Sequence, residues 1–178
     1  ILLWQLAHVP GTFAGLTAGA YTITVEDANG CQTTVPATVT EPTALTLTEI
    51  STTDANCNGD ANGTLEVAGG GGTPAYQYSI DGGASWQASG VFTALTAGAY
   101  TLTVEDANGC QTTLGVTVNE PTAVTAAEIG TTDASCSGVS DGDLTAAGGG
   151  GVGGFSYSID GVAFGASPTF GGLASGTY

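Results

Sequence analysis

The chain repeats itself with a period of 79 residues, and this feature constrains its fold more than any other. The segment Leu16–Thr34 returns at Leu95–Thr113 with a single substitution, Ile23 in the first copy and Leu102 in the second. The tetrapeptide Tyr-Ser-Ile-Asp also occurs twice at the same offset. Internal repetition at a fixed period is typical of an array of similar structural units. We therefore expect tandem domains rather than one large core.

The phase of the repeat divides the sequence into three parts. Residues 44–121 form one complete unit, residues 1–43 correspond to the C-terminal part of a unit, and residues 122–178 correspond to the N-terminal part of a third. A partial unit would expose apolar edges, so we expect the sequence to be a window from a longer polypeptide. The alternative is that neighbouring copies complete these edges by strand addition and form a polymer.

The charge balance excludes two classes of partner. The chain has sixteen acidic residues and no lysine or arginine, which gives a formal net charge of −16. Binding to nucleic acid or to an anionic membrane surface depends on basic groups, so we expect neither. The apolar stretch Ile1–Val9 is too short to span a bilayer, and we expect no membrane insertion.

The hydrophobic pattern predicts an all-β fold. Hydrophobic residues make up 42% of the chain, enough to bury a core. No segment shows a helical apolar stripe, whereas the complete unit contains seven short segments with period-two alternation, separated by turn-forming residues. These are Leu45–Ile50, Thr64–Val67, Ala75–Ile80, Ser85–Ala88, Val91–Leu95, Tyr100–Glu105 and Gln111–Val118. The number and spacing are typical of an immunoglobulin-like β-sandwich, so we predict tandem sandwiches of this kind.

One local motif supports the sandwich. Leu95, Gly98 and Tyr100 form a Leu-x-x-Gly-x-Tyr sequence that occurs in all three parts of the chain. This pattern is typical of a tyrosine corner, in which the tyrosine hydroxyl bonds back to the preceding backbone while the leucine fills the core. We expect a structural role for these three residues.

Several motifs taken together resemble a known family. The series GGTPAYQYSID, LTAGAYTLTVEDANGC and VTVNEP, with an earlier Cys-x-Gly at Cys57–Gly59, resembles the SprB-type repeat. That family builds long cell-surface adhesins in Bacteroidetes, including a gliding-motility adhesin exported by the type IX secretion system. The resemblance implies an extracellular, cell-surface location.

Cysteines occur twice in each unit, and this even, periodic usage favours disulfides over metal thiolate sites. The family resemblance favours a bond within the repeat between Cys57 and Cys110, which leaves Cys31 and Cys136 to pair outside the sequence. In a simple sandwich, however, Cys57 and Cys110 lie at opposite ends of the domain. A bond between neighbouring units is therefore the alternative.

An oxygen-rich segment suggests a calcium site. The side chains of Asp54, Asn56, Asn58 and Asp60 match the D-x-N-x-N-G opening of a calcium loop, and calcium prefers six to eight oxygen ligands. The twelfth position, however, is Leu65 rather than an acidic residue. The alternative is a polar turn whose side chains bond to their own backbone. We expect calcium as the candidate cofactor, with these four residues as ligands.

The sequence does not indicate an enzyme. His8 is the only histidine, and the chain has no nucleophile elbow or HExxH motif. We expect a structural and adhesive repeat of a long secreted fibre, with neighbouring repeats or copies in a filament as partners and a surface or glycan ligand that the sequence does not specify. The alternative function is a carbohydrate-binding module that uses exposed aromatic residues such as Tyr76, Trp86 and Phe92. Aromatics packed inside the sandwich would favour the structural function.

Overall fold

The structure of the protein, a computed structural model, describes residues 11–178, so His8 and the stretch Ile1–Val9 lie outside the described residues. The chain divides into two compact units, residues 1–44 and residues 45–178. All regular elements of the described residues are β-strands, which confirms the all-β fold class. Within the same residues there is no helix with the length and apolar character needed to cross a membrane. The predicted boundary between residues 121 and 122 stays a prediction.

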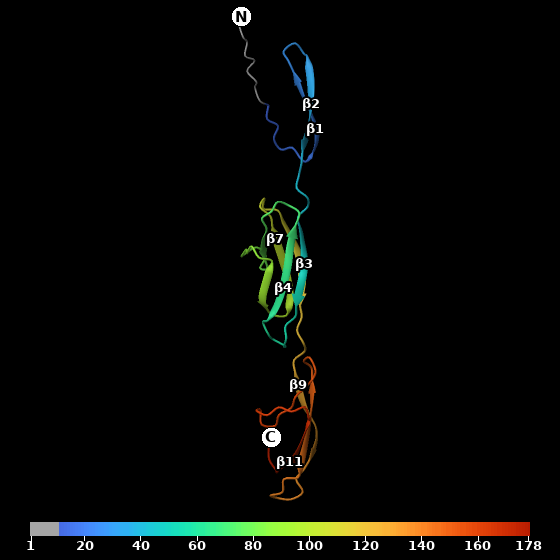
Figure 1. The fold of residues 1–178 in the computed structure, drawn as a ribbon, viewed down its shortest axis with the longest axis vertical. Helices are drawn as coiled ribbons and strands as arrows, with labels where there is room; N and C mark the ends of the chain where they lie inside the picture. Colours follow the sequence, from blue (N-terminus) through green and yellow to red (C-terminus); the bar gives the residue numbers. More distant parts are fainter. Residues whose placement is uncertain (1–10) are drawn as a thin grey trace. The chain divides into compact units, whose positions relative to one another are not determined.

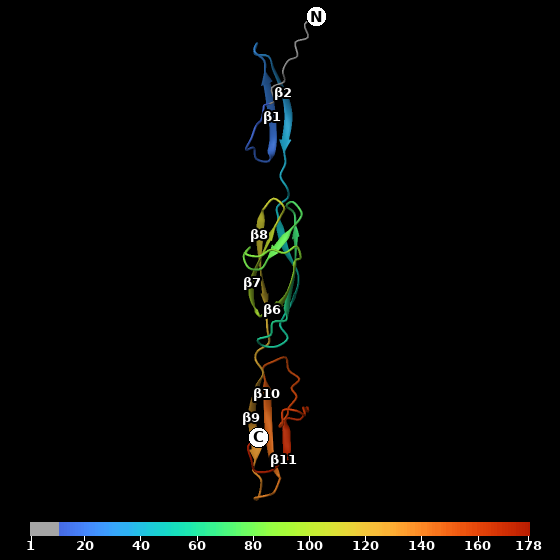
Figure 2. The ribbon, with the colours of Figure 1, turned by 90° about the vertical axis from the view of Figure 1, so that its left-hand side faces the viewer.

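Residues 45–121, here called the middle repeat, contain six strands in two antiparallel three-stranded sheets (Figures 1 and 2). One sheet has the order β3-β4-β6 and the other has the order β5-β7-β8. The strands are β3 (Thr46–Thr53), β4 (Gly63–Gly70), β5 (Gln77–Ser79), β6 (Val91–Leu95), β7 (Gly98–Glu105) and β8 (Gln111–Val118). The two sheets face each other through a single hydrophobic core.

This core explains the alternating pattern of the sequence. Successive side chains of a strand point to opposite faces, so every second residue of each strand enters the sandwich. Eight buried residues from both sheets form one cluster: Leu65, Val67, Tyr78, Phe92, Leu102, Val104, Val116 and Val118. Three of them, Leu65, Leu102 and Val104, have no exposed surface.

The predicted strand Ser85–Ala88 is not a strand in the structure. Only Gln87 pairs there, in an isolated antiparallel bridge with Tyr78. The carboxylate of Asp81 holds this segment in a turn, because it accepts hydrogen bonds from the backbone N–H and the hydroxyl of Ser85 at 2.9 and 2.5 Å. Local side-chain bonds of this kind compete with strand pairing.

Residues 11–44 contain one β-hairpin, made of β1 (Gly19–Glu26) and β2 (Gln32–Val39). Its register is that of the β7–β8 hairpin: Glu26 faces Gln32 as Glu105 faces Gln111. In both hairpins an aspartate caps the turn, Asp27 in the first and Asp106 in the second. Nearly identical sequences thus give the same local structure.

Residues 122–178 contain one three-stranded antiparallel sheet of order β11-β10-β9. Its strands are β9 (Thr125–Thr132), β10 (Gly142–Gly149) and β11 (Thr169–Leu173). By position in the repeat they correspond to β3, β4 and β6. Tyr157 forms an isolated bridge with Gly165, as Tyr78 does with Gln87.

Candidate functional site

The loop that joins β3 to β4 carries the residues predicted to bind calcium. We call residues 54–62 the exit loop. Within it, Asp60 N donates to the carbonyl of Cys57 at 3.1 Å, and Gly59 adopts a positive φ of 83°, which glycine tolerates without strain. Asn62 closes the loop: its Oδ1 accepts the N–H of Asn56 at 3.0 Å and its Nδ2 donates to Asp60 at 3.1 Å.

The start of the exit loop binds the segment that leaves the middle repeat. We call residues 119–124, between β8 and β9, the exit connector. The backbone N–H of Asn119 donates to Asp54 Oδ1 at 2.8 Å, and the N–H of Ala55 donates to the carbonyl of Asn119 at 2.9 Å. Ala55 is buried. This pairing continues the sandwich beyond the end of β8.

The tip of the exit loop binds the next residues of the connector. Gly59 N donates to Glu120 Oε2 at 2.6 Å, and Asn58 Nδ2 donates to Glu120 Oε1 at 2.8 Å and to the carbonyl of Pro121 at 3.3 Å. Hydrogen bonds to an ionised carboxylate are stronger than neutral ones. Sixty or more residues separate the partners, so the exit loop holds the exit connector by tertiary contacts. We call this set of hydrogen bonds between the two segments the exit clamp.

The four predicted calcium ligands therefore use their polar groups in different ways. Asp54 bonds to Asn119, Asn58 bonds to Glu120, Asp60 accepts from Asn62, and Asn56 contributes a backbone N–H. Within residues 11–178 there is no group of three or more His, Cys, Asp or Glu side chains that could hold a metal ion. Calcium binding at the exit loop stays a prediction, while the clamp is present without it.

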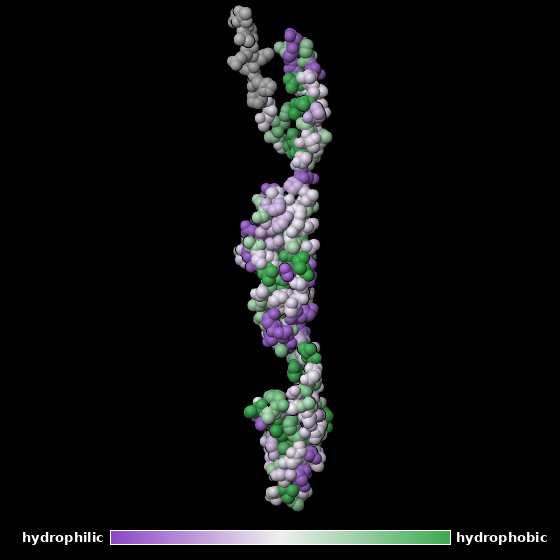
Figure 3. All heavy atoms as spheres, viewed as in Figure 1, coloured by the Kyte–Doolittle hydropathy of each residue, from purple (hydrophilic) through white to green (hydrophobic). Residues whose placement is uncertain are grey.

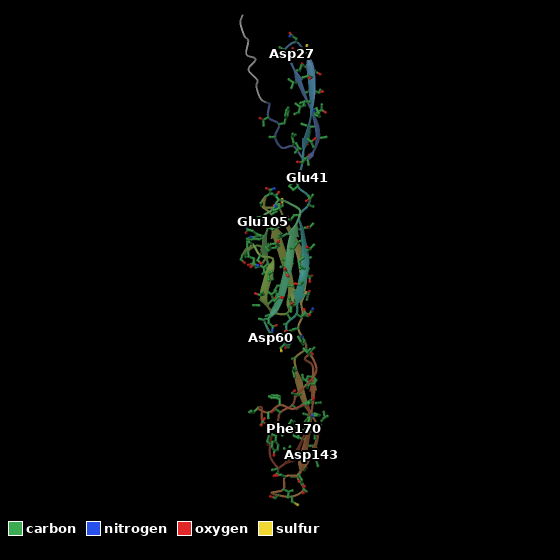
Figure 4. The ribbon with its side chains drawn as sticks, viewed as in Figure 1. Asp27, Glu41, Asp60, Glu105, Asp143 and Phe170 are labelled. Carbon is green, nitrogen blue, oxygen red and sulfur yellow. The ribbon has the colours of Figure 1, made fainter. Side chains whose placement is uncertain are left out.

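The structure does not bring Cys57 and Cys110 together. Cys57 lies in the exit loop, beside the C-terminal end of β8, whereas Cys110 precedes the first residue of that strand. Figure 4 shows Asp60 and Glu105, close neighbours of the two cysteines in sequence, at opposite ends of the middle repeat. An eight-residue strand is about 25 Å long, far more than the roughly 7 Å between Cα atoms that a disulfide bridges. The predicted bond within the repeat is thus absent from this structure, where all four cysteines are free and exposed.

The aspartate of the β7–β8 turn organises the opposite end of the middle repeat. Asp106 is buried and accepts three backbone hydrogen bonds, from Thr73 at 2.8 Å and from Asn108 and Cys110 at 2.9 Å. These bonds hold the pKa of Asp106 below its usual value, and the bond from the N–H of Thr73 contributes most. Burial acts in the opposite direction and raises the pKa. Its counterpart Asp27 lacks a bond like that from Thr73, and its pKa is lowered mainly by the N–H of Cys31. Asp106 is therefore a turn cap and not an isolated charge.

Two further carboxylates are held by hydrogen bonds in the same way, Asp81 after β5 and Asp160 at the corresponding position of the third part of the chain. Hydrogen bonds from Ser85 and Ser79 lower the pKa of Asp81. In the third part of the chain, the N–H groups of Ala163 and Val162 lower the pKa of Asp160 to about 2. Such groups remain ionised and bonded at neutral pH, which suits a structural role better than proton transfer.

The aromatic residues of the middle repeat serve its packing. Tyr100 Oη donates to the carbonyl of Thr96 at 2.8 Å, the hydrogen bond of a tyrosine corner, with Leu95 packed against the core. The same bond occurs at Tyr21 and Tyr178. Phe92 is buried, and Tyr76 packs on the core while donating to the carbonyl of Gly71 at 2.6 Å. Trp86 is half-buried, so residues 45–121 present no fully exposed aromatic side chain.

These features define a class of protein: an all-β repeat whose loops bind its own connector. A family model described as the SprB repeat matches residues 50–85, which contain the exit loop, β4 and β5. The match confirms the SprB resemblance for this segment and points to a cell-surface, adhesin-like repeat module. The SprB repeat is a structural repeat and not an enzyme family. No curated protein and no solved structure matches the chain.

Sequence reasoning missed Asn119, Glu120 and Asn62 as partners of the exit loop. A signal was present, because the dipeptide Glu-Pro occurs at both Glu41–Pro42 and Glu120–Pro121, at corresponding positions of two units. From the sequence alone, this dipeptide indicates only the end of a strand and a stiff connection. The acidic group that meets the loop tip comes from far along the chain, and local spacing does not reveal it.

Proposed function

We propose that this protein is a structural and adhesive repeat module of a long secreted cell-surface fibre. The observation that carries the proposal is the SprB match at residues 50–85, in a unit whose sequence recurs on both sides of it. A gliding-motility adhesin exported by type IX secretion is the specific form of this function that the family resemblance suggests. The absence of basic residues fits partners other than nucleic acid.

The exit clamp supports this function physically. A tether that carries load between repeats benefits from connectors that do not move freely, and here Asp54, Asn58 and Gly59 all bond to residues 119–121. Pro121 further restricts the backbone of the connector. Load on the connector is thereby transferred to the β3–β4 and β7–β8 ladders, which span the length of the repeat.

The alternative, a carbohydrate-binding module, receives less support. Sugar recognition by stacking needs an exposed aromatic surface, whereas Phe92 lies in the core and Tyr76 and Trp86 are half-buried. A glycan array probed with the 178-residue chain and with a Trp86→Ala variant tests this alternative directly. Binding that disappears in the variant would favour sugar recognition through Trp86.

Surface display and adhesion test the proposal itself. Antibodies raised against residues 45–121 should label intact cells of the producing organism, and proteinase K should remove the label; trypsin lacks lysine and arginine sites in this chain. Beads coated with the chain should adhere to surfaces that the cells colonise, more strongly than beads coated with an unrelated acidic protein. Label that requires cell permeabilisation would refute a surface role.

Calcium binding at the exit loop is a further proposal. Thermal unfolding of the chain in calcium and in chelator is the direct measurement. We expect a higher midpoint in calcium that is lost in an Asp54→Asn, Asp60→Asn double variant. Equal midpoints in the two conditions would leave the exit loop as a hydrogen-bonded clamp only.

A further inference from the structure

The chain contains four Asn-Gly dipeptides, and one of them lies in the exit clamp. They are Asn29–Gly30, Asn58–Gly59, Asn62–Gly63 and Asn108–Gly109. An asparagine before glycine loses its side-chain amide readily, because no side chain hinders the attack of the glycine nitrogen on the asparagine Cγ. Two nitrogen atoms take part: the glycine backbone nitrogen, which attacks, and the asparagine Nδ2, which leaves. The structure distinguishes the four dipeptides by what surrounds these two atoms.

At Asn58–Gly59 both nitrogen atoms meet one carboxylate. Gly59 N donates to Glu120 Oε2 at 2.6 Å, and Asn58 Nδ2 donates to Glu120 Oε1 at 2.8 Å. A single proton-accepting group therefore lies against the attacking atom and the leaving atom at once, which is the placement that proton transfer between them requires.

Water also reaches this dipeptide. Asn58 is exposed, and a Cβ atom added at Gly59 would meet nothing within 4 Å. Figure 3 shows hydrophilic residues at the surface of this end of the middle repeat, which Figure 4 marks with Asp60. The water needed to hydrolyse a cyclic product is thus available at the site.

The two dipeptides in the hairpin turns have a different environment. Gly109 N donates to the backbone carbonyl of Asp106 at 2.9 Å, and Gly30 N donates to that of Asp27 at 3.0 Å. The carboxylates of these aspartates accept other N–H groups. A peptide carbonyl oxygen does not take up a proton at neutral pH, so the turn dipeptides serve as internal references.

The fourth dipeptide, Asn62–Gly63, is held in place by the fold. The amide of Asn62 bonds through Oδ1 to the N–H of Asn56 and through Nδ2 to Asp60. Gly63 is buried, and a Cβ atom added there would lie 2.6 Å from Val118. The attacking nitrogen is therefore packed inside the sandwich, and Asp60 contacts only the leaving group.

From this arrangement we propose that Asn58 is a self-modification site, at which Glu120 transfers the proton that converts the asparagine to aspartate and isoaspartate. The carboxylate accepts the Gly59 N–H proton while the electron pair of that nitrogen forms a bond to Asn58 Cγ, whose oxygen takes the negative charge. Nδ2 becomes basic in this intermediate and takes the proton from the Glu120 carboxyl group.

The Cγ–Nδ2 bond then breaks, the oxygen restores its double bond to Cγ, and ammonia leaves. The chain now carries a cyclic succinimide, and Glu120 is again a carboxylate. Water hydrolyses the ring at either carbonyl group and leaves aspartate or isoaspartate at position 58.

The product weakens the exit clamp. A carboxylate at position 58 cannot donate the bonds that Asn58 Nδ2 makes to Glu120 and to the carbonyl of Pro121, and it places a like charge beside Glu120. The hold on the exit connector therefore loosens as the molecule ages. This inference goes beyond the proposed function and does not rest on it.

The test follows the four dipeptides during long incubation of the full 178-residue chain at neutral pH, with chelator and reductant present. Chymotryptic peptides are analysed by mass spectrometry with electron-transfer fragmentation, which distinguishes isoaspartate from aspartate. We expect Asn58 to react fastest of the four, and faster in the folded chain than in urea. Asn29 and Asn108 should react more slowly in the folded chain than in urea, because a fixed backbone hinders ring closure.

Two variants identify the carboxylate. Glu120→Gln keeps the shape of the side chain but cannot take up the proton, so it should slow the reaction of Asn58 by about tenfold or more. The rate at Asn108 should not change and reports an intact fold. Glu41→Gln is the matched control, because Glu41 occupies the corresponding position one repeat earlier, and it should leave the rate at Asn58 unchanged.

The pH profile separates proton transfer from a change of loop geometry. Deamidation without a catalytic group depends on hydroxide, so Asn29 and Asn108 should react faster as the pH rises from about 6 to about 8. A glutamate carboxylate is ionised throughout this range, so the rate at Asn58 should stay nearly constant, and Glu120→Gln should restore the rise. The proposal is overturned by any of three results: a slower reaction of Asn58 in the folded chain than in urea, a rate in Glu120→Gln equal to or above that of the wild type, or a profile at Asn58 parallel to those at Asn29 and Asn108.

Discussion

Val25 and Val104 offer a matched pair for measuring what tertiary burial contributes. Both valines occupy the same position of nearly identical hairpins, yet Val104 is 0% exposed and Val25 is 59% exposed. Replacing a buried valine by alanine removes the equivalent of two methylene groups, about 1.6 kcal/mol of transfer free energy at about 0.8 kcal/mol each. The cavity that remains adds to this loss, so we expect Val104→Ala to lower the free energy of unfolding by about 2 to 3 kcal/mol. Val25→Ala should cost less than about 0.5 kcal/mol.

The measurement is urea denaturation of the full chain, at a concentration where it is monomeric. Trp86 fluorescence reports unfolding of the middle repeat for Val104→Ala once Trp4 is replaced by phenylalanine in every variant, and amide hydrogen exchange of β1 reports the stability of the hairpin for Val25→Ala. Equal losses for the two substitutions, or a loss below about 1 kcal/mol for Val104→Ala, would refute the assignment of the core to the contact between the two sheets.

Three further predictions follow from particular contacts. Ala94 has a positive φ of 58°, which is strained for alanine, so Ala94→Gly should raise the free energy of unfolding by about 0.5 to 1 kcal/mol. The control Ala99→Gly should lower the free energy of unfolding, and a lower value in both variants would contradict strain at Ala94. The pKa of Asp106 is lower in the folded state than the usual value near 3.9, so its contribution to stability is present above that value and is lost as the pH falls through the folded pKa. Thermal midpoints between pH 6 and pH 2 should therefore fall less in Asp106→Asn than in the wild type, and parallel curves would contradict this. Glu120→Ala should speed hydrogen exchange of the Gly59 amide about fivefold, while Glu41→Ala should leave it unchanged; equal protection in both variants would show that the clamp bond is absent in solution.

The strand pattern of the middle repeat was predictable because it is local. Alternating apolar residues and turn formers located six of its strands, and β8 begins and ends at the predicted residues Gln111 and Val118. The seventh predicted segment, Ser85–Ala88, fails because Asp81 binds Ser85 and holds a turn. Hydropathy alternates there as it does in a strand, and that pattern does not reveal the hydrogen bonds that Ser85 donates to the carboxylate of Asp81, four residues earlier.

The exit loop was predictable as a polar turn but not as a clamp. Gly59 and the surrounding Asn and Asp residues indicate a tight loop by their conformational preferences. Whether such a loop binds a cation or a neighbouring segment depends on what lies opposite it. Here the opposing group is Glu120, whose carboxylate accepts the loop N–H groups.

By itself the sequence determined the local structure of this protein: two nearly identical segments form hairpins with the same register, the same aspartate-capped turn and the same tyrosine bond. These features depend on contacts within a few residues or across one turn, so the same amino-acid sequence forms them in both hairpins. Only the tertiary structure decided that Val104 is buried while Val25 is exposed. Burial depends on a second sheet supplied by distant residues, and the middle repeat has that sheet in place.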